Sequence, residues 1–397
     1  MSERSVIARS RRAWSALPRW VRICLVALAA RVLSLILLLI AFTIAHAHGW
    51  TGMDARHPVP DSVAFLGMWD SRWYAEIATQ GYPHQLPMVG GSVGQNAWAF
   101  LPVFPALVRG LMATGAPFPL LGTLISIAAS AAAAVVLHRL VSLRVAPQQA
   151  RWAVLLFCFS PWSFIFSTAY AEALFVLLLF SGLVFIEQRR YELATAVAVV
   201  AAFTRPGALA LALVLAIHLV VRFVRRRDDP LAVRDAARIT VAGLVTASAG
   251  LAWPLIAAAV TGRPDAYIAT ETAWWSNTIP DPHLFPLTPW FLVGYAYLGI
   301  AGAVAVAVAV AAGIVWMCGK PFRRLGPVTA GYLWSYTLYL FAVFLPQQSL
   351  PRVMLPLAPA FADERLTRTR ARRVGILVVF LALQPVAIAL LWLRGAP

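Results

Sequence analysis

The sequence has little charge. Only 12% of its 397 residues are charged and 61% are hydrophobic, whereas an ordinary soluble domain carries about 25% charged residues. Because a chain this apolar cannot cover a soluble globule with polar side chains, the composition predicts a polytopic membrane protein. Lysine is almost missing too, since 32 of the 33 basic residues are arginine. The net charge of +17 would suit a nucleic-acid-binding protein, but most arginines lie in short clusters between apolar runs, which is the positive-inside pattern of membrane proteins.

Several kinds of chemistry have no support in the sequence. Its three cysteines, Cys24, Cys158 and Cys318, lie within or at the edge of apolar runs, so no disulfide framework is predicted. No glycine-rich nucleotide loop, serine-hydrolase elbow or zinc-protease motif occurs, so the sequence gives no support for nucleotide binding, ATP hydrolysis or zinc proteolysis. Asp54 and His57 have an i,i+3 spacing, but no histidine pair has a recognised metal-ligand spacing. We therefore expect no metal site and no cofactor, and dependence on a divalent cation stays open.

The apolar runs predict an all-α bundle of about ten or eleven membrane segments, several of them too short to cross alone. The first, from Trp20 to Ala45, follows a basic N-terminus and is too long for a signal-peptide core, so we expect an uncleaved anchor. The others are expected at 117–140, 149–166, 169–187, 191–203, 206–223, 238–260, 290–317, 326–345, 350–361 and 374–393. All belong to a single domain covering residues 1–397.

The arginine clusters predict the orientation. Twenty-five of the 33 basic residues fall on the side of the N-terminus and seven on the other side. The positive-inside rule then places the N-terminus in the cytoplasm of a multi-pass cell-membrane protein. Two loops, 46–116 and 261–289, are expected outside, and the second, which contains Trp274, is either a lid over a sugar or lipid or an interfacial aromatic belt.

The stretch Trp69-Asp70-Ser71-Arg72-Trp73-Tyr74 concentrates charge and aromatic rings in the first outer loop. If residues 71–80 form a helix on the membrane surface, Asp70 begins it and shares a face with Trp73 and Tyr74. One interpretation is structural: Asp70 caps the helix, and Arg72 pairs with Glu76 on its surface. The other interpretation makes Asp70 a general base at the bilayer surface.

Four further ionisable residues lie close to apolar runs. Glu172 is the only carboxylate in a tight outer turn, where it either lies at headgroup level or faces a partner or cavity. Arg205 and Arg352 stand beside prolines that break helices, and each either reaches the interface or binds a phosphate. Arg31, inside the first run, either pairs with a carboxylate or reaches the interface.

Four motifs in order resemble those of the PIG-V-type GPI mannosyltransferases and their bacterial relatives. The resemblance covers roughly residues 65–210 and rests on Trp69 to Tyr74 with Gly81-Tyr82, on Phe100-Leu101-Pro102-Val103-Phe104-Pro105, on Ser160-Pro161 through Tyr170 and Glu172, and on Thr204-Arg205-Pro206. Leu350-Pro351-Arg352 lacks the histidine-containing pattern of the eukaryotic family, which leaves the acceptor open.

The resemblance implies a GT-C glycosyltransferase that takes a sugar, usually mannose, from a polyprenyl-phosphate donor on the non-cytoplasmic face. It implies an acidic base at the position of Asp70, and we expect Glu172 to assist. We expect Arg205 and Arg352 to stabilise the leaving phosphate, and Arg72, Trp73, Tyr74 and Tyr170 to contact donor, acceptor or lipid. The acceptor would be a glycolipid or cell-envelope glycan, and the transfer would invert the anomeric carbon. The alternatives are a flippase or transporter of lipid-linked glycans and a non-catalytic scaffold of the cell envelope.

Overall fold

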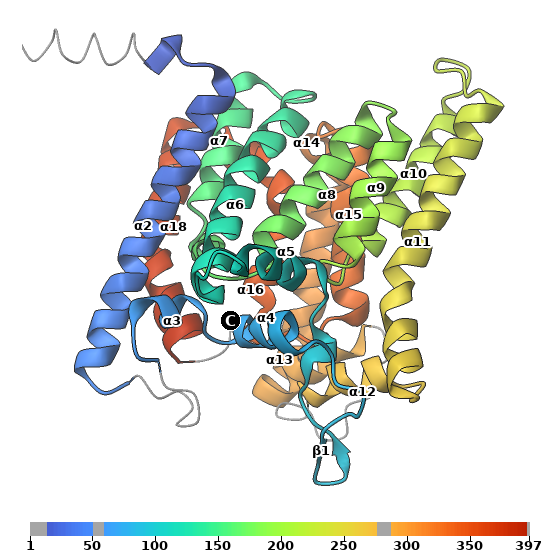
Figure 1. The fold of residues 1–397 in the computed structure, drawn as a ribbon. Coiled ribbons are helices and arrows are strands. Elements are labelled where there is room, and N and C mark those ends of the chain that lie inside the picture. Colours follow the sequence, from blue (N-terminus) through green and yellow to red (C-terminus); the bar gives the residue numbers. More distant parts are fainter. Residues whose placement is uncertain (1–13, 51–58, 276–286, 395–397) are drawn as a thin grey trace, which may run out of the picture.

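The protein is a bundle of α-helices, seen here in a computed structural model that describes residues 14–50, 59–275 and 287–394. The longer helices run side by side, while shorter elements cross their lower ends in the view of Figure 1. The longer helices are α2 (Arg19–Ala47), α6 (Phe118–Ser142), α7 (Pro147–Cys158), α8 (Glu172–Glu187), α9 (Tyr191–Ala202), α10 (Leu209–Val224), α11 (Val233–Thr261), α13 (Thr288–Cys318), α15 (Pro327–Val343) and α18 (Arg370–Ile388). The expected all-α polytopic membrane fold is confirmed.

The number of helices long enough to cross a membrane alone is smaller than the number of apolar runs in the sequence. In the described ranges five helices pass by length and composition, namely α2, α6, α11, α13 and α18. A sixth crossing is possible if α7 and the 3-10 helix η2 (Pro161–Ser167), bent by 68° between them, form one broken span. Pro161 starts η2, and because proline has no backbone N–H it cannot continue the hydrogen bonding of α7. Helix α13 is also broken, since Gly299 has a φ of 59° within it.

The segments expected to be short are short in the structure. Helices α9 and α10 have 12 and 16 residues and are separated by the turn around Thr204-Arg205-Pro206, as predicted. The run expected at 350–361 divides into α16 (Leu350–Val353) and the 3-10 helix η3 (Leu355–Ala362).

The two loops between spans carry small elements at one end of the bundle (Figure 1). They are α3 (Ser62–Leu66), α4 (Asp70–Gln80), the hairpin of β1 (Met88–Val89) and β2 (Ser92–Val93), the 3-10 helix η1 (Ala97–Ala99), α5 (Val103–Met112) and α12 (Ala266–Ala273). The remaining elements are α14 (Lys320–Arg323), α17 (Glu364–Thr367) and η4 (Ala389–Leu393). The helix expected over 71–80 is thus confirmed as α4.

Close approach of backbones fixes the segment that leads into α8. A Cβ added to Gly122 of α6 would lie 2.8 Å from Cβ of Ala169 and 3.2 Å from its Cα. Only glycine fits at this distance, so α6 packs directly on the turn that carries Tyr170 and Glu172.

Arg31 of α2 follows neither expectation, because it is buried and pairs with no carboxylate in the described part of the chain. It is buried, and its guanidinium donates to the carbonyl oxygens of Cys158 and Ser163 and to Ser163 Oγ. These carbonyls lie at the break between α7 and η2, where the regular helical donors end. The arginine thereby supplies donors to backbone that the bend has left without them.

Candidate active site

Helix α4 starts with an unusual backbone turn that brings Asp70 into the protein. Trp69 precedes the helix with a φ of 57°, a conformation that is uncommon for residues other than glycine. The helix is capped at Trp69 without a side-chain hydrogen bond, so Asp70 is its first residue and not its N-cap. The structural interpretation of Asp70 as a capping residue is therefore wrong, and its carboxylate is available for another partner.

That partner is Arg352 of α16, which lies 282 positions further along the chain. Arg352 Nη1 is 2.5 Å from Asp70 Oδ2 and 3.2 Å from Glu172 Oε1. Arg205 Nη1 lies 3.0 Å from the same oxygen of Glu172. Four residues that the sequence singled out separately therefore form one chain of charges, Asp70–Arg352–Glu172–Arg205, which we call the charge network.

The charge network is buried and electrically balanced. Asp70, Glu172 and Arg352 are 6%, 3% and 7% exposed, and two carboxylates face two guanidinium groups. Burying unpaired charges would cost several kcal/mol per ion, so the pairing is what makes this burial possible. Arg352 contacts both carboxylates and Glu172 contacts both arginines, so these two residues link the network.

Two tyrosines fix the backbone and the guanidinium groups of the network. The hydroxyl of Tyr170 accepts a hydrogen bond from the backbone N–H of Asp70 at 3.1 Å, and the guanidinium of Arg352 lies over its ring at 5.2 Å. The hydroxyl of Tyr74 accepts from Arg205 Nη1 at 3.3 Å. Both tyrosines are fully buried. Their contacts to the network are thus direct, while their expected contact to substrate stays a prediction.

Each charged residue is placed by a break in a helix. Glu172 is the first residue of α8, where the helix dipole favours a negative charge. Arg205 lies in the turn between α9 and α10, in which Gly207 has a φ of 113°. Arg352 is on the short helix α16, and the hydroxyl of Tyr336 donates to the next carbonyl, that of Val353, at 3.0 Å. The broken helices that the prolines predicted converge on one place.

An aromatic cluster covers the solvent side of α4. Trp73 stacks on Phe100 with ring centroids 5.9 Å apart, and Trp274 packs edge-on against both rings. Trp274 Nε1 is buried and has no hydrogen-bond partner in the described part of the chain. Trp274 therefore does lie against the first loop, as the lid interpretation requires. Arg72, in the first turn of α4, is half-buried.

One carboxylate beside the network was not predicted from the sequence. Glu271 of α12, outside the spanning helices, is hydrogen-bonded to Tyr267 and interacts electrostatically with Arg205 and Asp70. Burial raises the pKa of Glu271 to about 7. In the sequence Glu271 is one of two acidic residues, with Asp265, between the end of a span and two tryptophans, and that pattern equally suits an exposed loop.

The structure describes only part of the second loop and neither member of the Asp54/His57 pair. Within 14–50, 59–275 and 287–394, no three histidine, cysteine, aspartate or glutamate side chains are grouped as a metal site. Asp54 and His57, like residues 276–286 of the second loop, lie outside the described residues.

Comparison with known proteins finds a similarity that covers part of the chain. Residues 56–222 match the family model described as Mannosyltransferase (PIG-V). A protein of Mus musculus named GPI alpha-1,6-mannosyltransferase 2 is 34% identical over 138 residues, which are 32% of this chain and 26% of that protein. The proteins of the same name from Cricetulus griseus and Rattus norvegicus are 35% and 36% identical over the same length and shares.

The chain thus spans about a quarter of the length of the curated relatives it matches. No solved structure matches the chain. The expected resemblance to PIG-V-type mannosyltransferases is confirmed by these matches. Asp70, Tyr170, Glu172 and Arg205 fall inside the matched region, whereas Arg352 comes from the part of the chain beyond it.

Proposed function

We propose that this chain, whose residues 56–222 match the family model described as Mannosyltransferase (PIG-V), is a membrane mannosyltransferase with its active site at the charge network. The observation that carries the proposal is the convergence of Asp70, Glu172 and Arg205 from the matched region with Arg352 from outside it. Three of these charged residues are buried and the side chain of Arg205 is 15% exposed. Charges held in this way are expensive, and in membrane proteins they mark functional sites.

In this proposal the donor is a polyprenyl phosphate that carries mannose, and the acceptor is a glycolipid or cell-envelope glycan. Asp70 removes the proton from an acceptor hydroxyl. The acceptor oxygen then bonds to the anomeric carbon as the bond from that carbon to the phosphate oxygen breaks. Attack from the side opposite the phosphate inverts the configuration of the anomeric carbon, and the polyprenyl phosphate leaves.

The arginines supply electrostatic stabilisation to that step. Before the reaction the charge of Arg352 is compensated by Asp70 and Glu172. When Asp70 takes up the acceptor proton it loses its negative charge and no longer compensates the positive charge of Arg352. At the same time negative charge develops on the phosphate oxygen, which Arg352 then stabilises. Fixed cations that face developing charge lower the barrier because they need no reorganisation. Glu172 holds both arginines in place, and Arg72, Trp73 and Trp274 are proposed to contact the sugars.

The test of the base is Asp70→Asn, assayed for mannose transfer from polyprenyl-phosphate mannose in membranes. We expect a loss of roughly 10²- to 10⁴-fold, the range for removal of a general base. Asp61→Asn is the matched control, since Asp61 is in the same loop but caps α3 by accepting from Val63 and Ala64, and asparagine caps as well as aspartate. If Asp70→Asn, at equal expression, transfers mannose at the rate of the Asp61→Asn control, Asp70 is not the general base.

The proposed orientation places the charge network outside the cell and the N-terminus in the cytoplasm. It is tested in a variant whose three native cysteines are replaced, with single cysteines at Ser92 in the hairpin and Arg226 after α10. We expect a membrane-impermeant thiol reagent added to intact cells to label Ser92→Cys and not Arg226→Cys. The reverse pattern would contradict both the orientation and the use of an external lipid-linked donor.

A further inference from the structure

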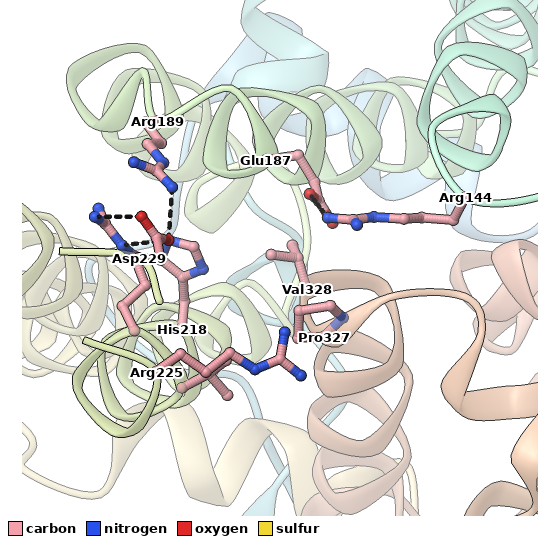
Figure 2. Close-up of a pocket in the computed structure, with 10 residues that line it drawn as sticks. Arg144, Glu187, Arg189, His218, Arg225, Asp229, Pro327 and Val328 are labelled. Carbon is pink, nitrogen blue, oxygen red and sulfur yellow. Dashed lines mark hydrogen bonds and ion pairs between the residues drawn. The ribbon is translucent and has the colours of Figure 1, made fainter. Parts of the chain in front are cut away.

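A second polar site lies at the opposite end of the helices that carry the charge network. Helix α8 begins at Glu172 in the network and ends at Glu187, about 22 Å away at the helical rise of 1.5 Å per residue. Glu187 lines a cavity of about 140 Å³ together with the ends of α10 and the start of α15. One water molecule needs roughly 10–15 Å³ of such space, so the cavity has room for a group larger than a single water. Its lining residues are shown in Figure 2.

Arginine dominates the lining of this cavity. Arg144, Arg189, Arg222 and Arg225 face it with Glu187 and Asp229, which leaves a formal charge of +2. Arg189 pairs with Asp229 at 2.6 Å, and Arg144 pairs with Glu187 at 2.7 Å. Arg225 forms no ion pair with any residue in the described ranges, and Figure 2 shows it extending towards Pro327.

Some polar atoms of the cavity are left without hydrogen-bond partners among the described residues. Arg222 is 3% exposed, and its Nε, although 3.4 Å from Asp229 Oδ2, lacks an acceptor in hydrogen-bonding geometry. Glu187 Oε1 is buried and has no donor. Helix α15 adds an N-terminus that no side chain caps, with Pro327 and Val328 in the cavity wall. Arg222, Arg225 and this helix end attract an anion, while Glu187 requires a donor.

The protein surface next to the cavity is apolar. Val220, Phe223 and Val224 of α10 are between 55% and 69% exposed and directly precede Arg225. Apolar side chains exposed on a membrane helix face lipid acyl chains. An occupant with a charged end in the cavity and an apolar part along α10 satisfies both surfaces, which a free anion does not.

We propose that this cavity binds a phospholipid headgroup that contains a phosphate and a hydrogen-bond donor, such as glycerol or ethanolamine. The phosphate lies between Arg222, Arg225 and the N-terminus of α15, and the hydroxyl or ammonium group donates to Glu187. Basic pockets at the ends of membrane helices recognise lipid headgroups by this chemistry. The proposal is independent of the mannosyltransferase reaction.

The test compares Arg225→Ala with Arg226→Ala in the full-length protein. Arg226 is the adjacent arginine, donates to the carbonyl of Phe223, and is not part of the cavity lining, so both variants lose one charge at the same membrane surface. Retained lipid is measured by native mass spectrometry after exposure to phosphatidylglycerol, phosphatidylethanolamine or phosphatidylcholine, the last of which has no headgroup donor. A melting curve of each variant shows that it is folded.

We expect the parent protein and Arg226→Ala to retain phosphatidylglycerol or phosphatidylethanolamine in preference to phosphatidylcholine. Arg225→Ala should bind the preferred lipid about tenfold more weakly, the lower end of the cost of one lost charge-assisted hydrogen bond. Equal retention by the two variants, or equal retention of phosphatidylcholine, would overturn the site. Complete displacement of the lipid by millimolar inorganic phosphate would refute the lipid as its occupant.

Discussion

Removal of Arg352 is the strongest test of the charge network as a physical unit. Arg352→Met keeps a long apolar side chain and deletes the cation that both Asp70 and Glu172 contact. Glu172 keeps Arg205 at 3.0 Å, but Asp70 forms no other ion pair with a described residue. Deleting one partner of a buried pair costs about 3–5 kcal/mol, because the remaining charge stays buried without compensation.

This loss of unfolding free energy corresponds to a decrease in melting temperature that depends on the length of the chain. The entropy of unfolding is about 2.1 cal/mol/K per residue, which gives roughly 0.8 kcal/mol/K for this protein. A loss of 3–5 kcal/mol therefore lowers the melting temperature by about 4–6 °C. The melting of purified protein in detergent is followed by tryptophan fluorescence.

The matched control is Arg324→Met. Arg324 also pairs with a carboxylate, that of Glu364 at 2.8 Å, but the two side chains are 66% and 40% exposed. Such surface pairs contribute about 1 kcal/mol at most, so its melting temperature should fall by about 1 °C or less.

The double variant Asp70→Asn/Arg352→Met decides between charge and packing. It removes both ends of the 2.5 Å pair, so no carboxylate is left buried alone, and it should melt at a higher temperature than Arg352→Met. If the shifts of the two single variants simply add in the double variant, the residues do not interact energetically and the network is refuted.

Two further predictions concern groups beside the network. Because burial raises the pKa of Glu271 to about 7, above its usual value of about 4.3, the folded protein holds this proton more tightly than the unfolded chain. The contribution of Glu271 to stability should therefore be greatest below pH 4.3 and be lost as the pH rises through 7, so Glu271→Gln should flatten this part of the melting-against-pH curve; parallel curves would contradict the assignment. Gly122→Ala should destabilise by about 1–3 kcal/mol, since its Cβ would press on Ala169. Gly110→Ala, a helical position in α5 with nothing within 4 Å of the added Cβ, should stabilise by about 0.5–1 kcal/mol; melting shifts of the same sign would show that α6 does not pack as described.

The sequence predicts the charged members of the site because each breaks a local rule. Asp70, Glu172, Arg205 and Arg352 stand out as charges or prolines beside apolar runs, and such exceptions are visible without a structure. Their pairing is not visible, because residues 70 and 352 come together only through the packing of the whole bundle. For the same reason the sequence predicts an interfacial or phosphate-binding role for the arginines but not their ion pairs with carboxylates.

Helix length is the part of the fold that hydropathy describes least well. The run expected at 149–166 is predominantly apolar, yet it bends by 68° between α7 and η2. Glu271 was missed because α12 has no pattern that separates it from an exposed loop, and its burial depends on neighbours distant in the sequence. Local sequence signals predict where a helix ends, but tertiary packing determines which side chains contact the exposed backbone at that helix end.

The position of Arg31 also bears on how the chain enters the membrane. Its acceptors at Cys158 and Ser163 follow it by 127 and 132 residues, so the first span is synthesised well before they exist. An arginine at a span centre costs about 2.5–3.5 kcal/mol on insertion, while leucine, isoleucine, valine and phenylalanine each contribute about −0.3 to −0.6. The 15 such residues of α2 supply about −4.5 to −9 kcal/mol. Helix α2 can therefore insert while Arg31 has no hydrogen-bond acceptor. Arg31 then binds the carbonyl groups at the break between α7 and η2 once that later segment has inserted.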